Sequence, residues 1–392
     1  MRECVGVVHD RPVPLGDSVV STSLWTEEDI HIFRGARGSS HPRSKWWRPC
    51  PPGDDEELQE VRVIERVEFE VYTETPTPDH YRHDWVPAPG VELGGIWGPA
   101  VVTAPDGQWY FGLRGWSDFI FGMTHTVSPV CGFQALSPGL DATPTHLYPE
   151  YAGIDWMEPY LAVEEDGRST LTYDSGSVER QQGATHWVDA SGRWDLRGTT
   201  ISDIFVVHVP VQEGVDREVY YRHELLKATG TVDGKDVEGY LHQDFAYGPP
   251  GTTYTDLAIA RDLYGMWVSW IHEDEDGEPG GGCFWQGRDG IDFGPGYLLD
   301  GGVTTAYDDI TATEEINAAG QMTRLDVSIG GQSFRFDLDM AGSPIHFFGR
   351  VAENSGGRTI TKSWCWVEYP GGMINGEILD AITEKYRLAR RT

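Results

Sequence analysis

The sequence predicts an all-β protein made of two antiparallel β-barrel halves packed together, with one short helix at the C-terminal end. Gly (48 residues) and Pro (24 residues) are abundant, which favours frequent turns over long helices. Runs of aromatic and β-branched residues recur between these turns, and stretches with helical periodicity are scarce. Many short antiparallel strands at this spacing are typical of a barrel or a sandwich.

Pairs of these runs are joined by short turns rich in Gly, Asp, Ser or Pro, and each pair predicts a β-hairpin. The pairs are 99–104 with 109–115, 160–165 with 169–173, 187–189 with 194–196, and 324–329 with 333–340. The last strand of this series alternates apolar and charged residues, so one face is expected to be buried and the other solvated. The apolar residues are Phe334, Phe336, Leu338 and Met340, and the charged residues are Arg335, Asp337 and Asp339.

The chain is expected to have three parts. Residues 1–60 contain segments rich in Arg, Gly and Pro and predict a largely irregular N-terminal extension. Residues 61–215 are expected to form the first β-barrel-like domain and residues 216–392 the second, divided near the loop Pro210–Asp216. Within the second domain, Glu377–Arg391 places its apolar residues near one face, which predicts a terminal helix packed on the β body.

The protein is strongly acidic. Its 62 Asp and Glu residues exceed its 30 Lys and Arg residues, giving a formal charge of −32, and only five of the basic residues are Lys. Nucleic acids and anionic membrane surfaces attract positive patches. The composition therefore argues against a nucleic-acid partner and describes solubility rather than a function.

The five cysteines are odd in number, far apart, and without metal-ligand spacing: Cys4, Cys50, Cys131, Cys283 and Cys365. A secreted disulfide framework is not expected from this pattern. The first residues lack an apolar run long enough for a signal peptide, and no window approaches the ~18 apolar residues of a membrane span. The sequence thus favours a cytoplasmic protein without stable membrane insertion.

The stretch Gly230–Gly248 carries the strongest candidate for a functional site. An Asp233-Gly234 turn predicts a hairpin here, because a tight hairpin turn needs positive φ at its central residues. The second strand delivers three proton-handling side chains, which are His242, Asp244 and Tyr247. A polar strand end at a rim is the alternative explanation.

Alternation along this strand divides its side chains between two faces. His242 and Asp244 are two residues apart, so they leave the same face, together with Tyr240. Leu241, Gln243 and Phe245 take the other face. Because an outward polar face would give the same pattern, the alternation alone leaves open which face is buried.

Two segments resemble motifs of a known superfamily. Gly239–Gly248 and Trp364–Glu377 are similar to the middle motif and the closing strand of the lipocalin-like double-barrel superfamily. That superfamily includes carotenoid 1,2-hydratases (hydroxyneurosporene synthases), AttH-type proteins and fungal Diels–Alder-type cyclases. The sequence departs from the pattern where Phe245-Ala246 replaces Ser-Trp of many relatives. The resemblance implies two calycin-like barrels with an apolar pocket between or within them.

The chemistry that the resemblance implies needs no cofactor. A buried carboxylic acid with a raised pKa can protonate an alkene or a carbonyl, and the resulting cation can rest against aromatic faces. Asp244 is the candidate acid, or the residue that orients His242, and Tyr247 is a candidate hydrogen-bond donor. His125 is added as a fourth candidate catalytic residue, and a core or loop histidine is its alternative.

Aromatic side chains on alternating strand positions are the candidate walls of the pocket. The candidate substrate-binding residues are Trp116, Asp118, Trp156, Trp267, Trp270, Trp364 and Trp366. Aromatics at strand spacing also serve as ordinary core residues, which is the alternative for this set.

Three functions remain open at this point. The first is a cofactor-independent hydratase, cyclase or isomerase acting on a hydrophobic isoprenoid, steroid-like or polyketide substrate. The second is a non-catalytic carrier of such a molecule, and the third is a carbohydrate-active β protein, which paired carboxylates and Trp platforms also suit. No metal is expected, since the acidic and His-rich segment Asp79–Asp84 follows two prolines and predicts a loop. The sequence does not define the oligomeric state.

Overall fold

A computed structural model describes residues 65–116, 130–136, 154–173, 176–189, 194–252, 257–317, 322–341 and 346–369 of the chain. For 113–116, 130–136, 154–160, 173, 189 and 339–341 it describes the backbone alone. The predicted N-terminal extension (1–60), the predicted C-terminal helix, Asp118 and His125 lie outside the described residues.

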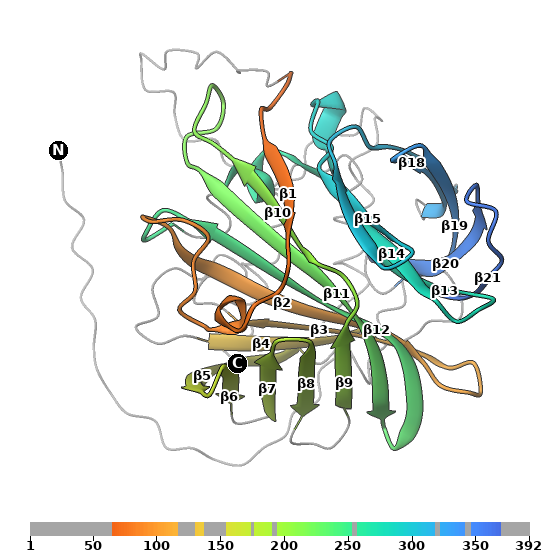
Figure 1. Ribbon diagram of the computed structural model, residues 1–392, viewed down its shortest axis with the longest axis horizontal. Helices are drawn as coiled ribbons and strands as arrows, with labels where there is room; N and C mark the ends of the chain where they lie inside the picture. The colour runs from red at the N-terminus through yellow and green to blue at the C-terminus, as the bar shows by residue number, and fades with distance from the viewer. Residues whose placement is uncertain are drawn as a thin grey trace, which may run out of the picture.

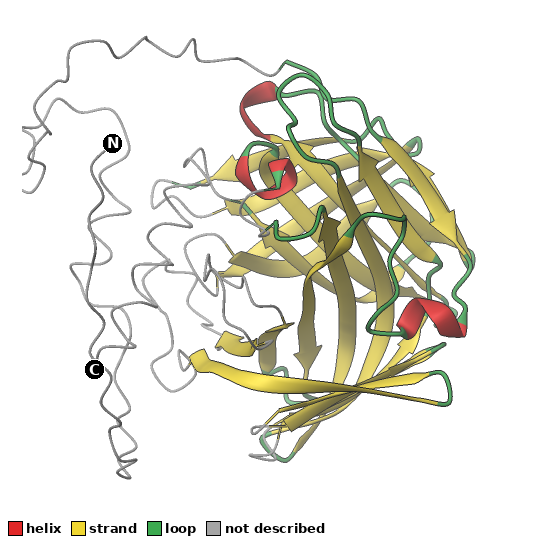
Figure 2. Cartoon of the chain, turned by 90° about the vertical axis from the view of Figure 1, so that its left-hand side faces the viewer, coloured by secondary structure: helices red, strands yellow, loops and turns green. Residues whose placement is uncertain are grey.

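Strands dominate the described part of the chain, as Figure 2 shows. The helices in that part are short: η1 (Pro78–Tyr81), α2 (Ala258–Arg261) and η4 (Arg288–Gly290). None of the helices described is long and apolar enough to span a membrane. The predicted all-β class is therefore confirmed.

The first sheet runs in the order β1-β10-β11-β12-β2-β3-β4-β5-β6-β7-β8-β9, and β9 also pairs with β11. That last pairing closes the strands β11, β12 and β2 to β9 into a barrel, with β1 and β10 continuing beside the first half of β11. The strands are β1 (Glu70–Glu74), β2 (Glu92–Thr103), β3 (Trp109–Trp116), β4 (Val130–Leu136), β5 (Ile154–Glu165), β6 (Arg168–Tyr173), β7 (Gly176–Gln181), β8 (Ala184–Asp189), β9 (Trp194–Thr200), β10 (Ile204–Val209), β11 (Val219–Val232) and β12 (Lys235–Gly248).

The second sheet is antiparallel and open, in the order β16-β15-β14-β13-β21-β20-β19-β18-β17. The strands are β13 (Tyr264–Asp274), β14 (Pro279–Gly287), β15 (Gly296–Asp300), β16 (Val303–Tyr307), β17 (Thr311–Ile316), β18 (Met322–Ile329), β19 (Gln332–Ala341), β20 (His346–Asn354) and β21 (Ile360–Glu368). Its concave side holds its own apolar core, in which Trp270 lies 5.4 Å from Phe334 and 5.3 Å from Phe336 between ring centroids.

A third core lies between the two sheets, where β11 and β12 pack against β13, β14 and β21 (Figure 1). The first sheet contributes residues such as Tyr221, Leu225 and Tyr240, and the second contributes Trp267 and Trp366. The strands β11 and β12 therefore separate two compartments, the interior of the first barrel and the interface between the sheets. Each side chain on these strands faces one compartment or the other.

The predicted hairpins form as β2–β3, β5–β6, β8–β9, β11–β12 and β18–β19. The Asp233-Gly234 turn has φ values of 49° and 76°, as the tight turn requires. Sheet membership differs from the division expected at residue 215, since β11 and β12 hydrogen-bond to strands of the first sheet. The hairpin of β11 and β12 belongs to the first sheet, because β11 pairs with β9 and β12 pairs with β2. The chain therefore passes from the first sheet to the second between Gly248 and Tyr264.

Candidate functional site

The hairpin of β11 and β12 directs a row of polar side chains into the core between the sheets. The face of β12 that carries Tyr240, His242 and Asp244 is the one turned toward the second sheet. Across the hairpin, His223 of β11 is the direct partner of Asp244. The predicted alternation of β12 is confirmed, and the packing of the second sheet makes the polar face a buried one.

Two histidines and one aspartate form the centre of this site. Nε2 of His242 lies 3.1 Å from Oδ1 of Asp244, and the rings of His223 and His242 are 4.9 Å apart. Nδ1 of His223 lies 2.9 Å from the hydroxyl of Tyr297 on β15. Both histidines are fully buried, whereas the side chain of Asp244 keeps 13% of its surface exposed. Asp244 therefore lies at the edge of the site.

Aromatic rings of the second sheet cover these groups. Trp267 and Trp366 lie 4.9 Å and 6.4 Å from the ring of His242, and Nε1 of Trp267 donates a 2.9 Å hydrogen bond to the hydroxyl of Tyr221. The hydroxyl of Tyr240 donates to the carbonyl of Ser269 at 3.2 Å. The two sheets thus join through hydrogen bonds that also fix the walls of the site.

A second carboxylate, Glu368, lies at the end of β21. It is 3.4 Å from Nε2 of His346 and accepts a hydrogen bond from the hydroxyl of Tyr264. Tyr264 also lines a pocket of about 260 Å³, together with polar residues that include Gln286, Arg288 and Glu314. Tyr264 therefore links Glu368 to that pocket.

Burial favours the uncharged forms of Asp244 and the histidines. Burial, and secondarily the charge of Glu368, holds the pKa of Asp244 well above its usual range, although a hydrogen bond with Tyr221 opposes the shift. Burial lowers the pKa of His242 to about 3 and holds the pKa of His223 well below its usual range. Burial would raise the pKa of Glu368, but hydrogen bonds with His346 and Tyr264 outweigh it and leave the pKa lowered.

Several buried polar atoms of this site have no hydrogen-bond partner among the described residues. They are Nε2 of His223, both ring nitrogens of His242, Oδ1 of Asp244 and Nε1 of Trp366. The contact between His242 and Asp244 is close but lacks hydrogen-bond alignment. Unpaired buried polar groups are costly, so these atoms point to a water or a ligand that accepts and donates hydrogen bonds there.

His223, His242 and Asp244 are also the described residues that could hold a metal ion, since their ligand atoms all lie within 4.8 Å of one another. Two imidazoles and one carboxylate are a ligand set that transition metals use. The sequence spacing did not reveal this group because it comes from two strands. The expectation of no bound metal stays a prediction.

The structure brings together only part of the predicted set. Trp267 and Trp366 lie beside His242, and Trp364 lies further along the same core, where it donates a 3.1 Å hydrogen bond to Oγ1 of Thr103. Trp270 faces the interior of the second sheet instead, because it is three residues from Trp267 and strand side chains alternate. Trp116 and Trp156 are placed by their backbones alone, on β3 and β5.

Tyr247 also lies apart from His242 and Asp244. It is an odd number of residues away on β12 and faces the first barrel, where its ring is 5.8 Å from Trp85. The neighbour of Asp244 on β12 is therefore His242, whereas Tyr247, the candidate hydrogen-bond donor, lies in the other compartment.

Sequence reasoning missed His223, Tyr221, Tyr297 and Glu368. A signal for His223 was present, because a two-residue turn at 233–234 fixes the pairing of the hairpin and places 223 opposite 244. Glu368 also had a signal, since it continues the alternation of Trp364 and Trp366 along β21. Tyr297 had none, because β15 reaches the site only through the packing of the sheets.

No protein-family model matches this sequence, and no curated protein sequence matches it. Solved structures that match include a putative AttH from Nitrosomonas europaea, at 11% identity and a TM-score of 0.38, covering 70% of this chain and 92% of that chain. They also include kievitone hydratase from Nectria haematococca, at 10% identity and a TM-score of 0.36, covering 79% of this chain and 99% of that one. A protein named CghA matches at 10% identity and a TM-score of 0.36, covering 78% and 99%.

The first of these structures is a putative AttH, and AttH-type proteins belong to the lipocalin-like double-barrel superfamily that the two sequence motifs resemble. The likeness concerns the fold. At these identities and TM-scores it assigns no activity and no residue role to this chain.

Proposed function

We propose that this protein is a cofactor-independent enzyme that protonates an apolar, unsaturated substrate from Asp244. The observation that carries the proposal is the carboxyl group of Asp244 at the edge of an aromatic core, 3.1 Å from His242, where burial raises the pKa of Asp244 and lowers those of His242 and His223. A carboxylic acid kept protonated near neutral pH is suited to general acid catalysis.

The proposed step transfers the proton of Asp244 to an alkene carbon of the substrate. The O–H bond of Asp244 breaks as a C–H bond forms, leaving a carboxylate and a carbocation. The faces of Trp267 and Trp366 lie within reach of this charge and favour it through their negative quadrupoles. A water that adds to the cation gives a hydratase, and an internal alkene that adds to it gives a cyclase. Loss of one proton from the adduct to Asp244 restores the acid.

The aromatic surroundings support an isoprenoid, steroid-like or polyketide substrate. A sugar is less well supported, because the tryptophans beside Asp244 are buried in the core and do not line an open groove. The nitrogens of His223 and His242 that have no partner among the described residues provide positions where an oxygen of the substrate, or the attacking water, is oriented.

The test is incubation of the purified chain with a mixture of terpenes, prenylated phenols and linear polyketides, followed by mass spectrometry of the products. Hydration adds the mass of one water, whereas cyclisation or isomerisation leaves the mass unchanged and alters retention. Asp244→Asn keeps the shape of the side chain and removes the acid, so turnover should fall about 100-fold or more.

Asp337→Asn is the matched control, because Asp337 is exposed on β19, two strands away from β21 in the second sheet. It should leave turnover unchanged. An Asp244→Asn variant that turns over like the wild type would show the acid assignment to be wrong. Tight binding of a substrate without any product, in wild type and variant alike, would instead indicate a carrier.

A further inference from the structure

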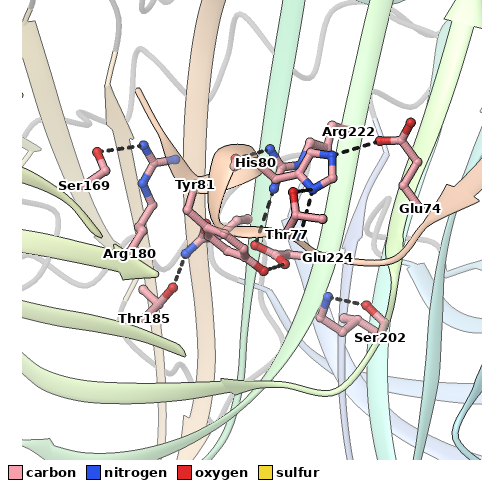
Figure 3. A network of polar contacts seen from close by, with 12 residues as sticks. Glu74, Thr77, His80, Tyr81, Ser169, Arg180, Thr185, Ser202, Arg222 and Glu224 are labelled. Carbon is pink, nitrogen blue, oxygen red and sulfur yellow. Dashed lines mark hydrogen bonds and ion pairs between the residues drawn. The ribbon is translucent and has the colours of Figure 1, made fainter. Parts of the chain in front are cut away.

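The interior of the first barrel contains two buried arginines that the proposed reaction does not use. Arg222 leaves β11 on the face opposite His223, and Arg180 comes from β7. Both arginines are 1% exposed, which is rare for a charged side chain without a matched partner. Figure 3 shows them with the polar residues around them.

Arg222 lies among aromatic rings. Its guanidinium is 4.6 Å from the ring centroid of Phe245 and 5.1 Å from that of Trp85. Nη1 donates a 2.6 Å hydrogen bond to the carbonyl of His80. Nη2 is 4.0 Å from Oε1 of Glu224, too far for a hydrogen bond. Nε and Nη2 have no hydrogen-bond partner among the described residues.

Arg180 is satisfied even less well. Its guanidinium lies 5.2 Å from the centroid of the same Phe245 ring, and Nη2 makes a long contact of 3.5 Å with Oγ of Ser169. Nε and Nη1 have no partner within the described part of the chain. Among the described side chains, four guanidinium nitrogens on these two neighbouring arginines thus lack a hydrogen-bond partner.

The described charges around these arginines do not balance. Glu224 is the fully buried carboxylate, and its Oε2 already accepts a 2.8 Å hydrogen bond from Tyr81. Glu164 also acts on Arg180, but it is exposed and accepts a hydrogen bond from the backbone of His83. Among the described side chains, two buried cations therefore face one buried carboxylate, and burying an uncompensated charge is strongly unfavourable.

We propose that the interior of the first barrel is a second ligand site, which binds the carboxylate group of a small organic molecule through Arg180 and Arg222. A planar carboxylate matches the fork of a guanidinium, and a single negative charge balances the one positive charge in excess among the described buried side chains. Phe245, Trp85 and Tyr247 provide apolar surface for the rest of the ligand. This site lies on the opposite face of β12 from Asp244 and does not depend on the proposed reaction.

The first experiment titrates the full-length wild-type chain with 4-phenylbutyrate, 4-phenyl-1-butanol and inorganic phosphate by calorimetry. Arg Nε–H signals in nitrogen-15 spectra are followed in parallel. We expect 4-phenylbutyrate to bind and to shift two slowly exchanging Arg signals. The alcohol of the same shape should bind at least about tenfold more weakly, because it lacks the charge. Absence of carboxylate binding, or preference for phosphate, overturns the proposal.

Variants then assign the site. Arg180→Met and Arg222→Met should each weaken 4-phenylbutyrate binding about tenfold or more, whereas the control Arg66→Met, at an exposed residue, should not. Arg180→Lys keeps the charge but removes the fork, and it serves if a Met variant does not fold. It should lose one of the two shifted Arg signals and weaken binding. Unchanged affinity in Arg180→Lys and in both folded Met variants also overturns the proposal.

Discussion

At His242 and Asp244, burial acts on an acid and a base in the same way, because it disfavours the charged form of each. The pKa of Asp244 is raised well above its usual range and that of His242 is lowered to about 3, so burial shifts both groups toward their uncharged forms. A proton donor beside a neutral imidazole results without any metal or cofactor charge. Both ring nitrogens of His242 lack a hydrogen-bond partner among the described residues, so this pair can accept a third group.

These shifts predict how stability depends on pH. The pKa of His242 is lowered, so its contribution to stability is fully present above about pH 6.5 and is lost as the pH falls toward about 3. Asp244 acts in the opposite sense, because its contribution is present below pH 3.8 and is lost as the pH rises through its raised pKa. As the pH is lowered from 7.5 to 5.5, the free energy of unfolding should therefore fall less steeply in His242→Gln than in the wild type. The difference in slope corresponds to the uptake of up to one proton on unfolding.

Urea unfolding of wild type and His242→Gln at several pH values measures these slopes. The comparison between the two proteins removes the contributions of Asp244 and of other histidines. Equal slopes in the two proteins would mean that His242 binds its proton as readily in the folded state as in the unfolded state, which contradicts the lowered pKa.

At the scale of single elements, the position of β12 depends on a glycine. A Cβ added at Gly239 would lie 2.1 Å from the carbonyl oxygen of Val101 and 2.7 Å from Cα of Val102 on β2. Both are backbone atoms, which cannot move aside without separating the strands. Gly234 in the turn of the same hairpin has open space around it and only a positive φ of 76°.

Gly239→Ala should therefore destabilise the protein by about 3 kcal/mol, at the upper end for overpacking, or prevent folding. Gly234→Ala is the matched control and should cost about 1 kcal/mol, since only backbone strain is added. Chemical denaturation measures both differences. Equal losses in the two variants would show that the close approach of β12 and β2 is not required.

The hairpins were predictable because their turns depend on local chemistry. Asp233-Gly234 and Gly330-Gly331 adopt the positive φ values that their residue types favour. The face on which a strand residue lies follows from whether it is an odd or an even number of residues from its neighbours. By that count Tyr247 faces the interior of the first barrel and Trp270 the core of the second sheet, so neither belongs with Asp244. The closure of β9 on β11 could not be predicted, since it joins strands far apart in a register that no local signal sets. The burial of Arg180 and Arg222 could not be predicted either. It depends on the closure of the barrel, and charged strand residues ordinarily face solvent.

For the whole molecule, the core between the sheets makes each sheet depend on the other. Tyr221, Leu225 and Tyr240 of the first sheet are buried by residues of the second, and they include the wall of the candidate site. The first sheet closes into a barrel and the second stays open, yet each needs the other to bury the apolar face that forms the core between them.

A chain ending at Thr252 should therefore expose this apolar face. We expect it to bind the dye ANS and to associate with itself, and co-expression with residues 257–392 should suppress both effects. ANS fluorescence and size-exclusion chromatography measure the two properties. A monomeric 1–252 fragment that does not bind ANS and unfolds cooperatively would show that the first barrel is independent of the second sheet.

The single strand β12 has a consequence for how this protein tolerates sequence change. Its even-numbered residues from Tyr240 to Asp244 serve one compartment, and Gln243 and Phe245 serve the other. Point substitutions can therefore alter either compartment without touching its neighbour. A one-residue insertion or deletion before Tyr240 would exchange the two sets, sending the acid into the barrel and Phe245 into the interface. We therefore expect β12 to tolerate substitutions but not insertions or deletions, and we expect changes in length to be tolerated in the turn at Asp233-Gly234.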